Sequence, residues 1–287
     1  MLLLTSKRDS YLRTIQLDST TLQNRHVIYI IDVSHVSYKS FFMKIWAIIP
    51  ARGGSKKLPG KNIKPIAGLP MIAWTIKAAH ETPAISRVIV STDDVTVADV
   101  ARQHGAEVPF LRPAELAQDD TTDWPVFFHA LEFFSAQGET LPDIVVHLRP
   151  TAPLRRPKHI QDCLDILLSH PEADSIRSVC RVSQQPYKMW VFAEDGLTLR
   201  PLMPDSSIER ELFNQPRQNL PPVWIQNGSV DIVRTSTILE KKSMSGNIIL
   251  GYEMRPEDSV NVDSESDFFL AEMLLQQRLK TSTSSFT

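Results

Sequence analysis

Two kinds of apolar pattern alternate along most of the chain: short continuous apolar runs, and longer stretches in which apolar residues recur at helical spacing. Short apolar runs such as residues 45–49 have the length of a buried strand. Between them lie stretches such as residues 123–136, whose apolar side chains recur on one helical face. The pattern predicts strands over residues 45–49, 88–90, 108–111, 144–148, 175–182 and 248–252, and helices over residues 71–79, 95–104, 123–136, 160–168, 236–242 and 265–279. This alternation predicts an α/β fold with a mostly parallel sheet and helices on both faces.

The alternation breaks between residues 183 and 227. This stretch is rich in proline, and its apolar groups at residues 189–192 and 223–225 suggest short strands. Exposed strands with aromatic side chains such as Trp190 and Trp224 often pack against another chain. We therefore expect a small β-rich excursion from the sheet that forms a homodimer.

The two ends of the chain do not continue this pattern. Residues 1–42 lack a periodicity that connects to the first strand, so we expect a poorly ordered extension, or a functional start at Met43. Residues 279–287 are rich in Ser and Thr and are expected to form a frayed tail. The main domain should then span residues 43–278, with the excursion inside it.

Composition narrows the class of protein. The 31 basic and 33 acidic side chains are mixed along the chain and give a net charge of -2, which argues against a broad nucleic-acid-binding surface. No apolar run approaches the roughly 20 residues of a membrane-spanning helix. Cys163 and Cys180 are too few for a disulfide framework and lack the spacing of a zinc site. We expect a cytoplasmic protein that binds neither nucleic acid nor membrane.

The loop after the first strand carries the candidate chemistry. Residues 50–61 hold three glycines and four cations and no acidic residue. Glycine lets backbone N–H groups approach an anion, while Arg52, Lys56 and Lys61 supply charge. At the carboxyl end of a parallel strand, this composition predicts a phosphate site. The loop matches neither G-x-x-x-x-G-K-[ST] nor G-x-G-x-x-G, which argues against an ATPase or a dinucleotide site. The alternative from composition alone is a surface turn with solvated cations.

Several motifs occur in a fixed order along the chain. The first is Ile-Pro-Ala-Arg-Gly-Gly-Ser-Lys at residues 49–56, followed by Leu-Pro-Gly-Lys-Asn at residues 58–62. The others are Ser-Thr-Asp-Asp at 91–94, Arg-Pro-Ala-Glu-Leu-Ala at 112–117, Arg-Pro-Thr-Ala-Pro-Leu-Arg at 149–155, Arg-Gln-Asn-Leu-Pro at 217–221 and Asn-Gly at 227–228. Together they resemble the signature of the acylneuraminate cytidylyltransferases, the CMP-sialic acid synthetases, over about residues 44–277. The resemblance implies a Rossmann-like nucleotidyltransferase domain.

The resemblance also implies a reaction. In this family the anomeric hydroxyl of a nine-carbon 2-keto acid attacks the α-phosphate of CTP, which gives a CMP-sugar and pyrophosphate with the assistance of Mg²⁺. Because both reactants are anionic, cations must neutralise and align them. The residues that the motifs assign to CTP are Arg52, Gly53, Gly54, Ser55, Lys61, Asn62 and Arg112, and those assigned to catalysis are Arg52, Lys61 and Asp263. Arg112 would help to position the cytidine; its alternative is a helix-capping or surface ion pair.

The metal motif departs from the family pattern. Where relatives carry Asp-x-Asp, this chain has Asn261 and Asp263. An amide oxygen can ligate a hard cation, but it brings no charge. We therefore expect a weaker Mg²⁺ site in which Asp263 is the main ligand and Asn261 an accessory one. Asp267 is expected to cap or flank the following helix.

The residues expected to bind the sugar include a second departure. Arg149 stands where many relatives carry glutamine, and a fixed cation there could pair with a substrate carboxylate or a phosphate. The resemblance places the acid sugar near Arg149, Thr151, Lys188, Arg217 and Gln218, and implies that the excursion also reaches the neighbouring subunit's site. For Lys188 the alternative is a cation lying over aromatic packing. The candidate sugars are N-acetylneuraminate, legionaminate and pseudaminate.

Two other functions fit the same motifs. One is a related nucleotidyltransferase for another 2-keto acid sugar, such as 3-deoxy-octulosonate. The other is a sugar-nucleotide binding protein that has lost turnover, an idea motivated by Asn261 and Arg149. The eight histidines lack the spacing of a metal site, and we assign none of them a role.

Overall fold

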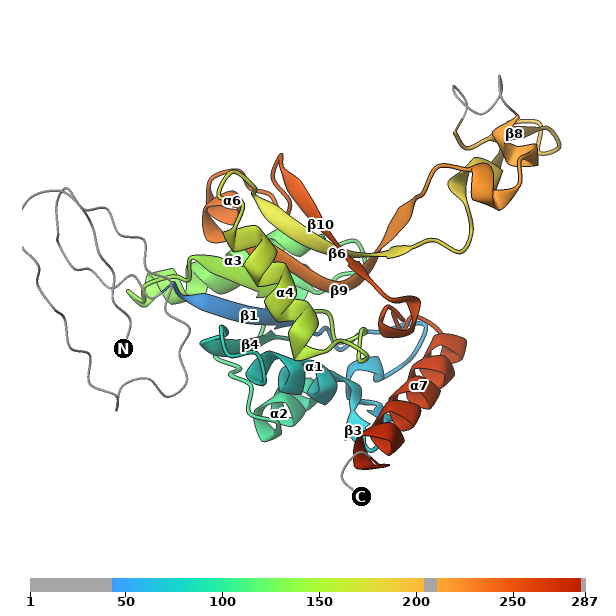
Figure 1. Cartoon of the computed structure of the whole chain (residues 1–287). Coiled ribbons are helices and arrows are strands. Elements are labelled where there is room, and N and C mark those ends of the chain that lie inside the picture. The colour runs from blue at the N-terminus through green and yellow to red at the C-terminus, as the bar shows by residue number, and fades with distance from the viewer. Residues whose placement is uncertain (1–42, 204–210, 285–287) are drawn as a thin grey trace, which may run out of the picture. The chain divides into compact units, whose positions relative to one another are not determined.

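A six-stranded sheet of order β10-β6-β9-β5-β1-β4 forms the centre of the computed structural model (Figure 1). The structure describes residues 43–203 and 211–284, with side chains to residue 281, so the predicted extension over residues 1–42 lies outside it. Its strands are β1 (Ile45–Pro50), β4 (Arg87–Ser91), β5 (Ile144–His147), β6 (Ser175–Arg181), β9 (Trp224–Arg234) and β10 (Ile249–Met254). β1 pairs in parallel with β4 and β5, and β6 with β10, whereas β9 runs antiparallel between β5 and β6.

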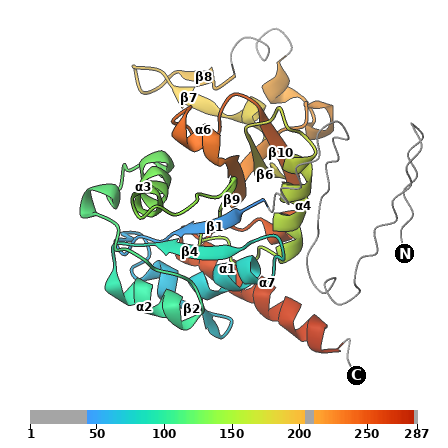
Figure 2. The same cartoon turned by 90° about the vertical axis from the view of Figure 1, so that its left-hand side faces the viewer.

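Helices cover both faces of the sheet, which confirms the predicted fold class. They are α1 (Met71–His80), α2 (Val95–Gln103), α3 (Asp123–Ala136), α4 (Pro157–Leu168), α6 (Thr235–Leu239) and α7 (Glu265–Ser284). Side chains of β1 alternate between the faces: Ile45, Ala47 and Ile49 pack in a core with α1, α2 and α4, while Trp46 and Ile48 pack with α3 and α6. Figure 2 shows α3 across the sheet from α1 and α2.

Several elements differ from the sequence pattern; the helix predicted over residues 236–242, for example, ends at Leu239. Residues 108–111 do not form the predicted strand. Only two isolated β-bridges, Glu107 with Ile89 and Leu111 with Thr92, pair this segment with the edge of the sheet at β4. The last helix does not end at residue 279 but continues to Ser284. The sequence pattern predicts no element over most of β9, since the polar residues of this strand interrupt the apolar run that usually indicates a strand.

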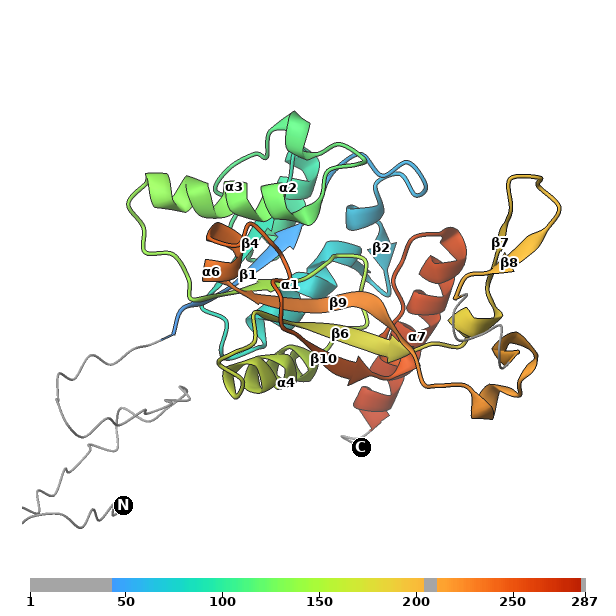
Figure 3. The ribbon, with the colours of Figure 1, turned by 90° about the horizontal axis from the view of Figure 1, so that it is seen from above.

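The excursion contains a short antiparallel hairpin of β7 (Trp190–Phe192) and β8 (Leu199–Pro201). It also contains the 3-10 turns η4 (Pro186–Lys188), η5 (Leu212–Asn214) and η6 (Arg217–Asn219). These elements lie beyond the ends of β6 and β9 (Figure 3). Residues 224–227, which the sequence placed in the excursion, belong to β9 in the sheet.

A third, smaller core lies beneath the loop that follows β1. It joins this loop and the hairpin of β2 (Pro65–Ile66) and β3 (Leu69–Pro70) to α7 and the segment before it. Its buried members are Leu58, Ile66, Met71, Leu154, Val262, Phe268, Ala271 and Leu275. Leu58 and Val262 flank the predicted phosphate and metal residues, so this core fixes both segments. None of the described helices is long and apolar enough to span a membrane.

Candidate active site

The loop after β1 is held at both ends by hydrogen bonds. Asn62 is buried, and its Nδ2 donates to the backbone oxygen of Arg52 at 2.9 Å. The backbone N–H of Gly53 donates to Asp93 Oδ1 at 3.0 Å, in the loop after β4. Asn62, which the motif assigns to CTP, therefore also closes the loop on itself.

The two adjacent glycines of this loop have different surroundings. A Cβ added at Gly53 would lie 2.4 Å from Asp94 Oδ2, whereas a Cβ at Gly54 would meet nothing within 4 Å. Asp94 itself is fixed, since its Oδ1 accepts the N–H groups of Thr96 and Val97 at the start of α2. The loop thus needs glycine at residue 53 for packing, while a side chain at residue 54 would extend into open space.

We expect Gly53→Ala to lower the free energy of unfolding by about 1–3 kcal/mol, because the added methyl overlaps Asp94. Gly54→Ala is the matched control and should leave the thermal midpoint unchanged. Thermal unfolding of the two variants checks this. Equal midpoints would contradict the close packing at Gly53.

Two cations of the loop share one carboxylate that the sequence analysis did not identify. Arg52 Nη1 lies 2.8 Å from Asp119 Oδ1, and Lys56 Nζ pairs with the other oxygen of the same side chain. These pairs hold the pKa of the Asp119 carboxyl below its usual value. Asp119 therefore occupies the position that an anionic ligand of Arg52 and Lys56 would take.

If a nucleotide phosphate binds these cations, it competes with Asp119. We expect Asp119→Asn to lower KM for CTP by about two- to fivefold, because exposed ion pairs are weak. The gain should shrink as salt screens the pair. Initial rates at two ionic strengths measure it, with Asp120→Asn as the adjacent control. A higher KM would mean that Asp119 supports the loop rather than competing for it.

Lys61 brings distant segments together. Its side chain is only 15% exposed, and its Nζ lies 2.9 Å from Asp263 Oδ1 and 3.0 Å from the backbone oxygen of Val262. The N–H of Val262 in turn donates to the backbone oxygen of Thr151 at 2.8 Å. The loop after β1, the loop after β5 and the predicted metal segment therefore meet at this lysine.

A cavity of about 460 Å³ opens beside this junction. Its lining joins predicted sugar residues to predicted metal residues and consists of Arg149, Thr151, Gln226, Asn227, Gly228, Asn261 and Asp263. Gly228 has a φ of 64°, and a Cβ there would lie 2.9 Å from Arg149 Nη1. Glycine at this position of β9 therefore makes room for the guanidinium.

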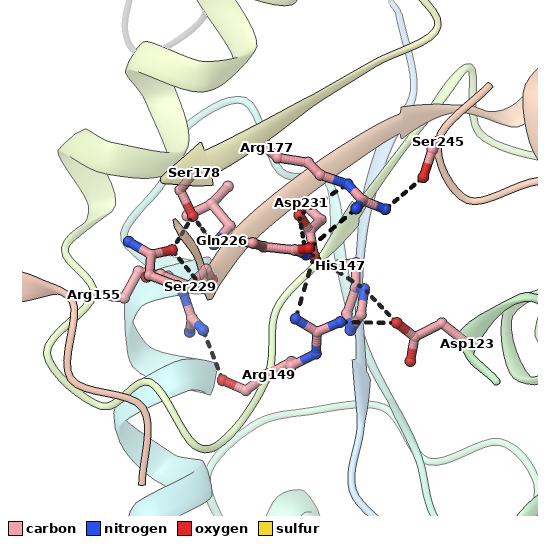
Figure 4. A network of polar contacts seen from close by, with 12 residues as sticks. Asp123, His147, Arg149, Arg155, Arg177, Ser178, Gln226, Ser229, Asp231 and Ser245 are labelled. Atoms are coloured by element: carbon pink, nitrogen blue, oxygen red, sulfur yellow. Dashed lines mark hydrogen bonds and ion pairs between the residues drawn. The ribbon is translucent and has the colours of Figure 1, made fainter. Parts of the chain in front are cut away.

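Arg149 is held between two carboxylates (Figure 4). Its Nη2 donates to Asp123 Oδ2 at 2.8 Å, and its Nη1 lies 3.5 Å from Asp231 Oδ2. Asp231 also accepts from Gln226 and lies 3.7 Å from Arg177 Nε. Burial raises the pKa of the Asp231 carboxyl, while Arg149 and Arg177 oppose that shift. The charge of Arg149 is thus matched within the protein.

Two buried side chains support this network. Burial, with Arg149 adding to it, lowers the pKa of His147 to about 3, so the imidazole is neutral and packs against the Phe127 ring. Arg155 donates to the backbone oxygens of Ser229 and Arg149 at 2.5 and 2.7 Å. Burial lowers the pKa of Arg155 to about 9, which leaves it cationic at neutral pH. Arg155 therefore ties β9 to the loop that carries Arg149.

Comparisons with known proteins identify the family of the chain. A family model described as cytidylyltransferase matches residues 46–189. A CMP-N,N'-diacetyllegionaminic acid synthase from Legionella pneumophila is 35% identical over 237 residues, which cover 82% of this chain and 97% of that protein. The chain belongs to the cytidylyltransferase family. An N-acylneuraminate cytidylyltransferase from Streptococcus agalactiae is 32% identical over 228 residues. The alignment covers 79% of this chain but only 52% of the streptococcal protein.

Solved structures share the fold of this cytidylyltransferase at low sequence identity. A CMP:2-keto-3-deoxy-manno-octonic acid synthetase complexed with CTP aligns with a TM-score of 0.59 at 19% identity. A 4-diphosphocytidyl-2C-methyl-D-erythritol synthase from Anaerococcus prevotii aligns with a TM-score of 0.55 at 13% identity. Each alignment covers 82% of this chain and 99% of the other. At these identities the likeness establishes the fold alone.

Four of the five predicted sugar residues of the cytidylyltransferase are divided between two cavities. Arg149 and Thr151 line the first. Arg217 and Gln218 instead line a second cavity of about 380 Å³ in the excursion. The rest of that second lining is Arg181, Val182, Gln185 and Leu220. Lys188 is an exposed residue of η4 and lines neither cavity.

Arg112 is a buried residue that contacts the loop after β1 of the cytidylyltransferase through Asp93. Its side chain is 4% exposed and its Nη2 is 3.6 Å from Asp93 Oδ1, the atom that also accepts from Gly53. Burial lowers the pKa of Arg112, and Asp93 opposes that shift. Arg112 is therefore neither a surface ion pair nor a helix cap, and it reaches the loop through Asp93.

Sequence reasoning missed the acidic side chains that order the site, chiefly Asp119 and Asp231. Asp231 sits between the buried residues Val230 and Ile232, and a lone acid within such an apolar stretch was a usable signal. Asp119 carried none, because it lies in a polar loop. The prediction that Asp267 caps a helix is confirmed: its Oδ2 accepts the N–H of Ser264, whose Oγ accepts the N–H of Asp267.

The donor set near Lys61 fits a magnesium ion bound largely through a ligand. The described residues contain no group of three or more His, Cys, Asp or Glu side chains that would hold a metal alone. Mg²⁺ commonly takes one or two protein carboxylates plus substrate phosphates and water. Asp263 supplies a carboxylate whose Oδ1 pairs with Lys61 and whose Oδ2 accepts from Asn261 Nδ2, and Asn261 Oδ1 is a buried acceptor without a hydrogen-bond partner among the described residues. The side chains of Asp263 and Asn261 both line the first cavity.

Proposed function

We propose that this cytidylyltransferase transfers CMP from CTP to a nine-carbon acid sugar and releases pyrophosphate. The observation that carries the proposal is the contact of Lys61, in the cationic glycine loop, with Asp263 at the edge of the 460 Å³ cavity. It joins a phosphate site to a cavity large enough for a sugar. The relatives named as legionaminic acid and acylneuraminate enzymes support the choice of substrate class.

Different residues bind the two anionic substrates, the nucleoside triphosphate and the acid sugar. Arg52, Ser55 and Lys61, with the open backbone at Gly54, hold the triphosphate, and Arg112 supports this loop through Asp93. The hydroxyl oxygen of the sugar forms a bond to the α-phosphorus and gives up its proton to solvent, while the bond from that phosphorus to the bridging oxygen breaks and pyrophosphate leaves. Alignment and charge neutralisation by fixed cations lower the barrier.

Mg²⁺ belongs to the proposed function. Asp263 would be its carboxylate ligand and Asn261 its amide ligand. When bound, the ion would neutralise phosphate charge that develops as pyrophosphate leaves. Because only one of the two side chains is charged, the protein should hold Mg²⁺ weakly until the nucleotide supplies further ligands.

A homodimer completes the acid-sugar site in this proposal. The β7–β8 excursion exposes Phe192 at 70% and Leu197 at 83%, a degree of apolar exposure typical of an interface. Its cavity carries Arg217 and Gln218, and Arg181 adds a second cation. Placed against the first cavity of a neighbouring subunit, these side chains would bind the sugar carboxylate beside Arg149, whose charge is shared with Asp123 and Asp231.

The test is a matrix of four nucleoside triphosphates against a panel of acid sugars, read by pyrophosphate release and product mass. The expected result is a CMP adduct of a nine-carbon sugar with CTP only. A product with 3-deoxy-octulosonate alone would favour the related enzyme. Tight CTP binding without pyrophosphate release at any Mg²⁺ concentration would favour a binding protein.

A further inference from the structure

A buried carboxylate outside both cavities gathers cationic side chains from two helices. Asp258 ends the 3-10 turn η7 (Pro256–Asp258) and is 3% exposed. Its Oδ1 lies 2.9 Å from Arg156 Nη2 and 2.5 Å from Arg278 Nη2, and its Oδ2 lies 3.6 Å from His159 Nε2. Because Arg156 and His159 stand at the start of α4 and Arg278 stands on α7, Asp258 joins these two helices at one point.

The residues that follow Asp258 carry the proposed metal ligands. Residues 259–263 belong to no helix or strand. Their position therefore depends on individual contacts with neighbouring segments, which we call anchors, and not on the regular backbone hydrogen bonds of a helix or sheet. One anchor is Ser259 Oγ, which accepts from Asn227 Nδ2 at 3.0 Å. Another is the N–H of Val262, which donates to the loop after β5. Asp258 is the anchor at the amino-terminal end of this segment.

The other end of the segment runs directly into α7. The N–H of Asp263 donates to Asp267 Oδ2 at 3.1 Å, within the cap of that helix. Further along the same helix, Arg278 reaches back to Asp258, and its Nη1 donates to the backbone oxygen of Leu154 at 2.8 Å. Helix α7 therefore holds the segment at both ends.

We propose that Asp258 is a positioning residue for the metal segment: through Arg278 and Arg156 it sets where Asn261 and Asp263 stand toward Mg²⁺ and the nucleotide phosphates. The inference rests on the proposed function, because it assigns a purpose to the order of that segment. Asparagine in place of Asp258 keeps the shape but removes the anion that both guanidinium groups face. The segment would then lose the anchor that ties it to α4 and α7.

The test compares Asp258→Asn with Asp174→Asn. Asp174 is a matched control because it is also buried and accepts from Lys241 and from the backbone N–H groups of Asn247 and Ile248, but it precedes β6 at the opposite end of that strand from the site. For each variant we would measure Mn²⁺ binding in the presence of CTP by electron paramagnetic resonance. The thermal midpoint, KM for CTP and the half-activating Mg²⁺ concentration complete the comparison.

Asp258→Asn should weaken Mn²⁺ binding and raise the half-activating Mg²⁺ concentration by about tenfold, while kcat at saturating Mg²⁺ stays near that of the unsubstituted protein. Asp174→Asn should lower the thermal midpoint without changing metal dependence. The proposal is overturned if Asp258→Asn also lowers only the midpoint.

A second variant keeps the test decisive if Asp258→Asn does not fold. Arg278→Lys keeps the charge but loses the forked donor, and it should shift metal dependence in the same direction by a smaller factor. Unchanged metal dependence in that folded variant would contradict the proposal. Failure of the proposed function would appear differently, as no pyrophosphate release from the unsubstituted protein, and the Mn²⁺ measurement would still decide the role of Asp258.

Discussion

Replacing Lys61 by alanine should lower kcat/KM for CTP by about 10²- to 10³-fold, the usual cost of removing one preorganised group that stabilises developing charge. The side chain is largely buried and its Nζ is fixed by Val262 and Asp263. Because the ammonium is already held in place, little free energy is spent on ordering it when the nucleotide binds. Its loss should therefore act mainly on kcat.

Lys57→Ala is the matched control for that variant. Lys57 lies four residues earlier in the same loop, and its side chain is exposed. Its removal changes the net charge of the loop equally, so KM and kcat should change less than twofold by screened long-range attraction alone. If Lys61→Ala stays within about threefold of the unsubstituted protein, the phosphate site is not at this loop.

Asp263→Asn should lower activity at physiological Mg²⁺ by about 100-fold, because it removes the one carboxylate that the segment offers to the metal. Part of the loss should be recovered at high Mg²⁺, since an amide oxygen remains a neutral ligand. The same change removes the partner of Lys61, so KM for CTP should change little or fall. A Mg²⁺ titration of pyrophosphate release separates these effects.

Glu265→Gln controls for the loss of a nearby negative charge. Glu265 is an exposed residue at the start of α7, two positions after Asp263. Its replacement should leave the Mg²⁺ dependence unchanged. Equal Mg²⁺ dependence of Asp263→Asn and the unsubstituted protein would argue that the metal is held by the nucleotide alone.

Side-chain periodicity was sufficient to predict the elements whose buried faces are apolar throughout. The apolar face of Asp123–Ala136 predicted α3 with its observed bounds. Strand β1 was found because both of its faces are buried, so its residues form an apolar run. Most of strand β9 could not be predicted in this way, because polar side chains interrupt its apolar run. It carries Asp231 and Ser229 inward because partners on other segments satisfy them, and no local pattern reports such partners.

The amino-acid pattern alone was sufficient to predict the α/β fold, the cationic glycine loop and the departure from aspartate at Asn261. Each of these depends on neighbouring residues or on one motif. The folded structure was needed to show that Arg149 is paired with Asp123 and Asp231, that Lys61 contacts Asp263, and that four of the five predicted sugar residues divide between two cavities. These contacts join residues that are far apart in the chain: Lys61 and Asp263 are 202 residues apart, and only the packing of the sheet, its loops and α7 brings them within hydrogen-bonding distance.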